Sequence, residues 1–348
     1  MMESQQAQRK NEHLSLATKY YQQAHVNNPF DQVRLIHTAL PEKAVSDIHL
    51  TTALAPGLKL TTPFYIEAMT GGSNQAKEIN RQLAYLAAKH HLAMATGSVS
   101  VALKNPQYRS SFKVVREENP DGLVIANLSA KATISEAQDA VDLLEANAIE
   151  IHLNAAQELI MPEGDRAFYW LTNIRNLVNT LNIPVIVKEV GFGMNKEDVA
   201  RLSKIGVKII NVSGRGGTNF AMIENRRNHQ TNFNSMIDWG QTTPEALLEA
   251  QAAGKDTIII ASGGITSPLD VIKSGVLGAQ ACGVAGYFLN VLAQGGVNAL
   301  DHTINEWKVV TTRLLTLLGV NNYAALRKAN YVLGPQLLSY ANQRHLKA

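Results

Sequence analysis

Cysteine and long apolar runs are nearly absent from this sequence. Cys282 is the only cysteine among 348 residues, which excludes an intrachain disulfide and a cysteine-rich zinc site. No apolar run reaches the roughly 18 residues of a membrane span, and the first residues, MMESQQAQRKNEHL, lack the apolar segment of a secretion signal. We therefore expect a cytoplasmic protein that does not enter a membrane.

A surplus of one charge sign is also lacking. The 32 basic and 29 acidic residues are interspersed, so no block or tail indicates a nucleic-acid partner, and any anion site must be local. What is abundant is apolar residues, at 45% against 18% charged residues, which argues against global disorder and predicts a sizeable core.

Eight short apolar segments recur along the chain, and amphipathic stretches separate them. The segments begin at Phe64, Leu92, Leu123, Ala148, Pro184, Val207, Thr257 and Gly278. In the stretches between them, such as 76–90 and 195–206, apolar residues recur every three or four positions, as in helices. Strands that alternate with helices predict a parallel sheet, and near-continuous apolar strands predict burial on both faces. We predict one α/β domain over residues 1–348, a (β/α)8 TIM barrel.

Two parts of the chain exceed what a minimal barrel needs. Residues 1–63 precede the first strand as an N-terminal extension, and residues 10–25 within it have a helical pattern. After the sixth strand, a polar excursion at 219–240 is too long for an ordinary loop, so we expect it to cover the active site or to be mobile. From Leu300 onwards we expect a helical tail.

Polar residues and glycines follow every predicted strand, at the barrel end where active sites of this fold lie. Taken singly, each is better explained as a turn glycine or a helix cap. They are residues 69–72, 96–98, Asn127, 152–158, 188–189, 213–218, 262–264 and 283–286.

The glycines after the seventh and eighth strands are more specific. Glycine lets backbone N–H groups approach a phosphate at a short helix N-terminus, the usual phosphate site of this fold. Lys188, at the end of the fifth strand, would then stabilise an anionic flavin ring over the barrel mouth. An equally good interpretation is a buried ion pair between Lys188 and a neighbouring carboxylate such as Glu189.

The loop after the fourth strand has the densest polar run, at residues 152–166. His152 and Asn154 share one face of the strand, so both point into the barrel mouth. Glu158 and Glu163 offer oxygen ligands, and a lone carboxylate beside a diphosphate is a common Mg²⁺ arrangement. The alternatives are a satisfied core histidine, and helix capping by Glu163 and Asp165.

Taken together, these motifs resemble those of the type 2 isopentenyl-diphosphate isomerases, a flavin-dependent barrel family. The resemblance spans nearly the whole chain, and its strongest signal is the run HLN, QE and PEGD within 152–165. The other motifs that carry it are 9–13 (RKNEH), 68–72 (AMTGG), 96–98 (TGS), 188–191 (KEVG) and 213–218 (SGRGGT).

The resemblance implies a role for each of these groups. It implies catalytic residues His152, Asn154 and Gln157 bordering the substrate, with Glu158 on Mg²⁺. It implies substrate contacts from Arg9, Lys10, His13 and Gln157, although the basic trio alone would be interpreted as a solvated face. The N-terminal arm would then fold over the mouth of its own or a neighbouring subunit. FMN would be held by Ala68, Met69, Thr70, Ser98, Asn127, Lys188, Ser213, Thr218, Gly263, Gly264, Ala285 and Gly286.

The implied reaction interconverts isopentenyl and dimethylallyl diphosphate, with NADPH only as the reductant of the flavin. Because this reaction has no net redox change, our hypothesis is that the reduced flavin acts as acid and base near N5 and stabilises a tertiary carbocation. Members of the family commonly form homo-oligomers, so a tetramer or octamer is expected.

Three rival functions remain. An FMN-dependent 2-hydroxy-acid oxidase would need a histidine base, and residues 213–218 contain none. An IMP-dehydrogenase-like nucleophile would need its cysteine on the loop after the sixth strand, whereas Cys282 lies in the eighth. A non-catalytic flavin-binding barrel would have no need of Gln157 and Glu158; it would hold yellow flavin without turnover.

Overall fold

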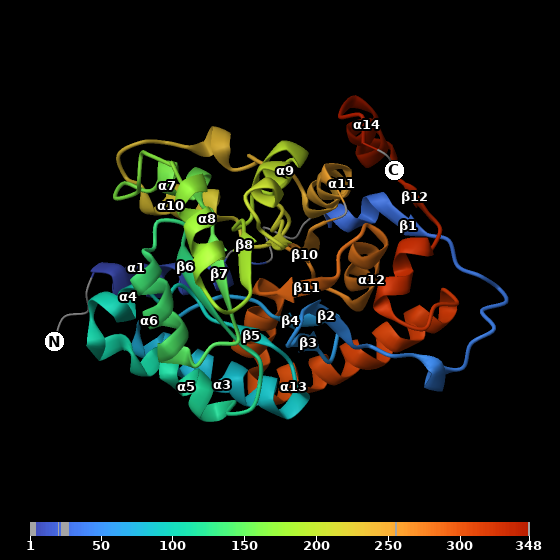
Figure 1. Cartoon of the computed structure of the whole chain (residues 1–348), viewed down its shortest axis with the longest axis horizontal. Coiled ribbons are helices and arrows are strands. Elements are labelled where there is room, and N and C mark those ends of the chain that lie inside the picture. Colours follow the sequence, from blue (N-terminus) through green and yellow to red (C-terminus); the bar gives the residue numbers. More distant parts are fainter. Residues whose placement is uncertain (1–4, 20, 22–27, 255, 347–348) are drawn as a thin grey trace.

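Eight parallel strands close into a barrel at the centre of the molecule. The computed structural model describes residues 5–19, 21, 28–254 and 256–346. Around the barrel the strand order is β10-β11-β4-β5-β6-β7-β8-β9, and each strand lies at a predicted apolar segment, so the predicted TIM barrel is confirmed (Figure 1). The strands are β4 (Phe64–Ile66), β5 (Met94–Ala95), β6 (Val124–Ser129), β7 (Ala148–His152), β8 (Val185–Lys188), β9 (Ile209–Asn211), β10 (Ile258–Ser262) and β11 (Ala281–Val284).

Helices follow the strands and cover the outside of the barrel. Several begin at an N-cap that the sequence supplies: Ser73 caps α3, and Thr133 forms a capping box with Glu136 at the start of α6. Helix α13 kinks at Gly296, the one residue in it with non-helical backbone angles. The helices are α3 (Asn74–His90), α4 (Ser100–Lys104), α5 (Ser110–Glu118), α6 (Ile134–Leu144), α8 (Leu171–Thr180), α9 (Lys196–Lys204), α11 (Thr243–Ala253), α12 (Pro268–Val276) and α13 (Gly286–Leu317).

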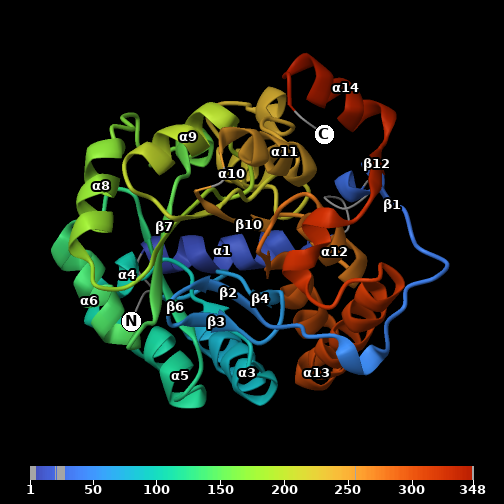
Figure 2. The same ribbon diagram turned by 45° about the vertical axis from the view of Figure 1, so that its right-hand side comes forward.

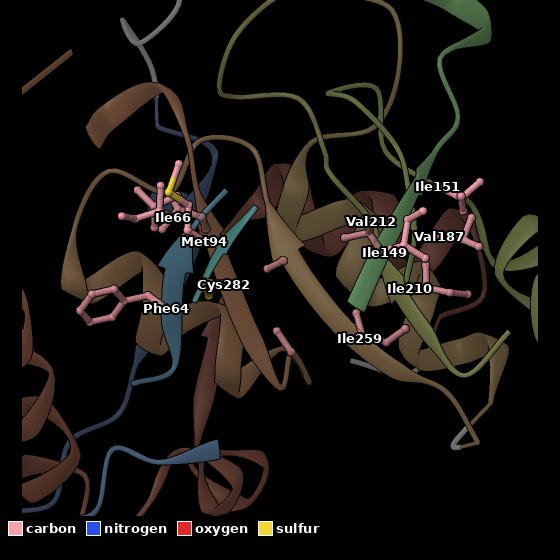
Figure 3. Packing of buried hydrophobic residues seen from close by; sticks show 14 of the residues in the cluster. Phe64, Ile66, Met94, Ile149, Ile151, Val187, Ile210, Val212, Ile259 and Cys282 are labelled. Carbon is pink, nitrogen blue, oxygen red and sulfur yellow. The ribbon is translucent and has the colours of Figure 1, made fainter. Parts of the chain in front are cut away.

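The strand residues that point outward form the main core with these helices. Figure 3 shows Ile149 and Ile151 of β7 close to Val187 and Ile210 of the next two strands, in the layer between sheet and helices. These residues are all buried. Burial on both faces therefore explains why the strands are almost uniformly apolar.

The strand residues that point inward change character along the barrel axis. The lower layer is apolar and includes Ile125, Ile186 and Ile260. A hairpin of the N-terminal extension, β2 (Thr52–Ala55) and β3 (Leu58–Leu60), adds its leucines to this cluster. Two residues further along, the inward side chains are polar in six of the eight strands, and the other two strands have glycines there; the polar residues are Glu67, Asn127, Glu150, Lys188, Asn211 and Ser262. The hairpin therefore closes the amino end of the barrel, and the polar layer leads to the open carboxyl end.

The rest of the extension reaches the opposite end. Helix α1 (Gln5–Lys19) runs across the barrel mouth (Figure 2), and the part of the expected helix at Tyr20 and 22–25 lies outside the described residues. Strand β1 (Val33–Leu35) pairs antiparallel with β12 (Tyr331–Leu333). The expected helical tail is only partly right, because α13 is followed by the 3-10 helix η5 (Tyr323–Lys328), β12 and helix α14 (Pro335–Gln343).

The excursion after β9 is folded against the barrel mouth. It contains α10 (Phe220–Arg227) and the short 3-10 helix η4 (Asn234–Met236). Helix α10 packs on α7 (Ala155–Ile160), which follows β7, through Ala221 and Ile160. Two remote loops thus meet over one part of the mouth. Among the described residues, no helix combines the length and apolar character that a bilayer crossing requires.

Candidate active site

A cavity of about 530 Å³ opens at the carboxyl ends of the strands. The predicted site residues line it from strand ends, loops and helix α1: Arg9, Lys10, His13, Ala68, Met69, Ser98, Asn127, His152, Asn154, Gln157, Glu158, Lys188, Ser213, Thr218, Gly263, Gly264, Ala285 and Gly286. Thr70 is the exception, because it is buried behind the lining and its hydroxyl has no hydrogen-bond partner. One cavity therefore brings together residues that the sequence scatters widely.

One side of the cavity fits a phosphate. Gly263 and Gly264 both have positive φ, at 89° and 74°, and a Cβ at Gly263 would collide with the carbonyl oxygen of Gly214. Next to them, helix α13 begins at Gly286, so its N-terminus faces the cavity. This arrangement suits the phosphate of FMN, the group for which these glycines were predicted.

The polar floor of the cavity holds Lys188 in a buried ion pair. Its Nζ lies 3.6 Å from Oε1 of Glu67, at the end of β4. The pKa of Lys188 is raised, because the carboxylates around it, Glu67 first, outweigh burial, which alone would lower it. The two interpretations of Lys188 are therefore compatible, since it is ion-paired and also lines the cavity.

The predicted partner Glu189 has a different role, which corrects that expectation. Its carboxylate accepts hydrogen bonds of 2.6, 2.8 and 2.6 Å from the backbone N–H groups of Val190, Gly191 and Phe192. Burial raises the pKa of Glu189 to about 7 although these bonds and Lys188 oppose it. Glu189 thus shapes the loop after β8.

His152 is held as a neutral imidazole at the cavity wall. Its Nδ1 lies 2.9 Å from Oδ1 of Asn127, which accepts, so the proton is on Nδ1 and Nε2 is an acceptor. Burial, and then the charges of Lys188 and Lys10, lower the pKa of His152 to about 3. His152 can therefore accept a hydrogen bond from a ligand but does not bring a positive charge.

The turn that starts α7 fixes three of the predicted residues. Asn154 donates its amide to Glu158 Oε1 at 2.8 Å, and the backbone N–H of Asp165 donates to Glu158 Oε2 at 2.7 Å. Gln157 donates its Nε2 to Oε1 of Glu224, at 2.8 Å. Within the described part of the chain, no three His, Cys, Asp or Glu side chains gather as metal ligands. Glu158 would therefore hold Mg²⁺ only together with oxygens of the substrate and water.

Glu163 and Asp165 do not cap the next helix, which corrects that alternative. Helix α8 starts after Trp170 without a side-chain cap. Glu163 lies 3.1 Å from Nη2 of Arg227, and Asp165 pairs with Lys131. Both carboxylates thus tie the loop after β7 to its neighbours, Glu163 to helix α10 and Asp165 to the loop after β6.

The basic trio of helix α1 faces the cavity and not the solvent. Arg9 lies 3.7 Å from Glu163, and Nε2 of His13 lies 2.8 Å from Oε1 of Glu224. Burial, followed by the charge of Arg9, lowers the pKa of Lys10 to about 8. In this chain, then, the arm covers the mouth of its own barrel and brings three basic side chains to it.

The remaining predicted residues differ in how they are held. Ser98 donates its hydroxyl to Ser100 at 3.2 Å, and the N–H of Ser213 donates to Oδ1 of Asn211 at 3.2 Å. Ser213 has a φ of 36°, in the left-handed region that few non-glycine residues adopt. Such local strain is common where a backbone must approach a ligand.

Sequence reasoning missed several groups around the cavity, all buried except the partly buried Arg227: Tyr65, Glu67, Glu150, Asn211, Glu224 and Arg227. A signal existed for Glu150, because it shares the two-residue period of His152 and Asn154 on the same strand. The signal for Glu67 was similar, a charged residue inside an apolar segment. Glu224 had none, since its position depends on how the excursion folds back.

Cys282 behaves as predicted for a residue within the eighth strand. It is fully buried in β11, and burial raises the pKa of its thiol to about 12. Such a thiol is a poor nucleophile.

Comparison with known proteins identifies relatives over the full length. A family model described as FMN-dependent dehydrogenase matches residues 104–332. The isopentenyl-diphosphate delta-isomerase of Limosilactobacillus reuteri (strain DSM 20016) is 65% identical over 348 residues, covering 100% of both chains. Proteins of the same name from Latilactobacillus sakei subsp. sakei (strain 23K) and Staphylococcus aureus are 47% and 43% identical; these matches cover 99% of this chain and 98% and 99% of theirs.

Solved structures share the fold at low sequence identity. A mutant flavocytochrome b2 with benzoylformate superposes with a TM-score of 0.67 at 17% identity, over 92% of this chain and 80% of that one. A mandelate oxidase variant gives a TM-score of 0.65 at 19% identity, over 93% and 92%. At such identities the likeness concerns the barrel fold alone.

Proposed function

Because the chain belongs to the isopentenyl-diphosphate delta-isomerases of the FMN-dependent dehydrogenase family, we propose that it interconverts isopentenyl and dimethylallyl diphosphate on a bound flavin. The observation that carries the proposal is the cavity itself. It combines a side suited to a phosphate at Gly263 and Gly264 with a basic side from helix α1, and the turn after β7 with Gln157 lies in the same lining.

The diphosphate would bind under helix α1. Arg9, Lys10 and His13 are the basic side chains that this helix contributes to the lining. Two of them lie against carboxylates, Glu163 and Glu224, which hold them in place at the cavity wall. Binding energy from the diphosphate would fix the position of the short hydrocarbon part, which offers little for recognition.

Mg²⁺ would add to this charge neutralisation. The Glu158 carboxylate lines the cavity, and its two oxygens are oriented by Asn154 and by the backbone of Asp165. A single protein carboxylate with diphosphate oxygens and water is a usual octahedral Mg²⁺ arrangement.

The chain's own residues would position the alkene and exclude water. The carboxylate of Glu224 accepts the Gln157 amide N–H, so the carbonyl oxygen of that amide is the atom free to face the substrate. Neutral His152 adds an acceptor without a competing cation, and Phe220 of the excursion closes the wall. Bound and reduced, with NADPH as the reductant, the flavin would supply proton transfer and an electron-rich face for a developing carbocation.

The test is turnover by purified protein loaded with FMN, given isopentenyl diphosphate, NADPH and Mg²⁺. We expect dimethylallyl diphosphate to form, and Gln157→Ala and Glu158→Ala to lower the rate. A second assay supplies a 2-hydroxy acid and oxygen, because turnover of these would instead support the rival oxidase. Full-rate isomerisation with oxidised FMN and no reductant would show that the reduced flavin is not the acid and base.

We also propose that the protein acts as a homo-oligomer, a tetramer or octamer. Association would cover exposed side chains of the kind enriched in interfaces, such as Tyr169 and Trp239, which are 95% and 61% exposed. Light scattering during gel filtration measures the mass, and a monomer at working concentration would rule the oligomer out.

A further inference from the structure

Beneath the cavity lies a group of buried ionisable side chains that the isomerisation does not require. Tyr65 of β4 and Glu150 of β7 are fully buried, and Glu67 is 2% exposed. All three point into the barrel, where Tyr65 packs in the lower apolar layer and Glu67 also lines the cavity. A buried carboxylate is stable only with enough donors, so the donors around each carboxyl group decide which one is charged.

Glu67 is surrounded by donors. Its Oε1 accepts the N–H of Ala68 at 2.7 Å and lies 3.6 Å from the ammonium of Lys188. Its Oε2 accepts the amide of Asn211 at 2.6 Å and the phenol of Tyr65 at 2.9 Å. Four donors, one of them a cation, are what an ionised carboxylate needs in a dry interior.

Glu150 is in the opposite situation. Its only well-placed donor in the part of the chain that the structure describes is the Asn127 amide, at 3.0 Å from Oε2. The Tyr65 oxygen is 3.5 Å from Oε1, but the single phenolic proton is committed to Glu67, at the shorter distance. This second contact is satisfied only if Glu150 donates, which requires a proton on its Oε1.

We propose that a hydrogen-bonded chain from Glu150 through Tyr65 to Glu67 keeps a proton on Glu150 and places the negative charge of the barrel floor on Glu67, where it compensates Lys188 beneath the bound flavin. The inference rests on the proposed function only in placing the flavin above Lys188. Glu67 and Glu150 are positioning residues, because they act through Lys188.

The direction of each pKa agrees with this geometry. Burial, and then the charge of Glu67, raise the pKa of Glu150 well above its ordinary value. Burial alone would raise the pKa of Glu67, but Lys188 and the Ala68 N–H bring it below the ordinary value. The floor therefore carries Lys188 and Glu67 as opposite charges, with no net charge under the flavin.

The first experiment detects the proton. In infrared difference spectra of the FMN-loaded protein at neutral pH, wild type minus Glu150→Gln should show the C=O stretch of a protonated carboxyl group. Glu189, whose pKa is about 7, is present in both proteins, so its signal cancels in the difference spectrum. Wild type minus Glu249→Gln is the matched control, because Glu249 is fully buried but ionised beside Arg344 and should give no such band.

Tyr65→Phe tests the link between the two carboxyl groups, and it also serves if Glu150→Gln does not fold. Loss of the phenol should shift the carboxyl band, whereas Tyr323→Phe, at an equally buried tyrosine away from the cavity, should not. Absence of the band in wild type, or an unchanged band in Tyr65→Phe, overturns the inference.

The second experiment measures the effect of this charge on the midpoint potential of the bound flavin. The variant Glu67→Gln/Glu150→Gln removes the negative charge, so reduced FMN should bind about tenfold more tightly relative to oxidised FMN, an upward shift of about 30 mV in the midpoint potential. Glu150→Gln alone removes a neutral group and should shift the potential by less than a third of that. An unchanged potential in the double variant, or an equal shift in the single one, contradicts the proposal.

These outcomes are separable from failure of the proposed function. A protein that takes up no FMN, or that carries FMN without isomerising, refutes the function whatever the infrared band shows. An active, yellow protein without the band refutes only the charge arrangement of the floor.

Discussion

The amide Nε2 of Gln157 lies 2.8 Å from Oε1 of Glu224, a fully buried carboxylate of the excursion after β9. This bond joins the loop after β7 to helix α10 and fixes which end of the Gln157 amide can face a substrate. The pKa of Glu224 is lowered to about 2, because His13, Gln157 and Arg227 outweigh the effect of burial. Glu224 is therefore ionised over the whole working range.

Glu224→Ala should lower kcat about 100-fold through loss of Gln157 orientation, while the protein keeps its FMN. Steady-state kinetics and the flavin absorbance measure this. Glu12→Ala is the control, since Glu12 also binds Arg227, at 2.7 Å, but is half-exposed and does not line the cavity. A higher KM with unchanged kcat would instead place Glu224 on the diphosphate side, through His13.

The lowered pKa of Lys10 predicts that substrate binding depends on pH. Its pKa of about 8 means that the ammonium is present below pH 8 and is lost above it in the substrate-free protein. Since a diphosphate prefers the charged form, KM should rise about tenfold between pH 7 and pH 9. Lys10→Met should have a high KM that varies much less over this range, whereas Lys113→Met, at an exposed lysine, should match wild type.

Gly263→Ala should abolish FMN retention. The added Cβ meets the Gly214 carbonyl oxygen, and the φ of 89° is strained for alanine. Gly57→Ala separates the two effects, because Gly57 has a φ of 78° but open space around its Cβ. The control should lose only about 1 kcal/mol of stability and keep its flavin. The flavin absorbance after dialysis measures how much FMN each variant retains. Normal retention by Gly263→Ala would be inconsistent with a phosphate site at this glycine.

Arg344→Ala should destabilise the protein in urea unfolding, because it leaves the buried carboxylate of Glu249 with fewer donors. Arg344 binds Glu249 at 2.7 Å and attaches helix α14 to α11. Arg201→Ala, which breaks an exposed pair with Asp198, should lose less than about 0.5 kcal/mol.

The effect of Arg344→Ala should also depend on pH. Despite burial, Arg344 holds the pKa of Glu249 below its ordinary value. The stabilisation is thus present above the ordinary pKa of a glutamate and disappears as the pH falls through the lowered folded value. Equal destabilisation at acidic and neutral pH would indicate lost packing of α14 instead.

Features of the fold and of the site could be predicted where residues close together in the sequence encode them. The barrel strands were predictable because burial on both faces leaves a local apolar run, as at Ile149 and Val187. Strand-end residues such as His152 and Lys188 were predictable because a parallel barrel brings all its carboxyl ends together. The chain therefore encodes the mouth of the barrel in short, independent segments.

The rest could not be predicted because it depends on contacts between distant segments. The short helix α7 is held by α10, and the pairing of Gln157 with Glu224 spans 67 positions. Lys188 pairs with Glu67 and not with its sequence neighbour Glu189, because the side chains of Glu67 and Lys188 both point into the barrel. Which residues pair depends on their distance in the folded structure, and the periodicity of the sequence does not predict that distance.

The pairing of Val33 with Leu333 has a consequence for how the protein is made. The first strand of this ladder leaves the ribosome about 300 residues before the second, so β1 has no partner during that interval. The barrel strands can assemble in that interval, and β1 pairs only after β12 has emerged. The ladder is therefore a late step of folding, and a nascent chain stalled before residue 331 would leave the edge of β1 open to other proteins.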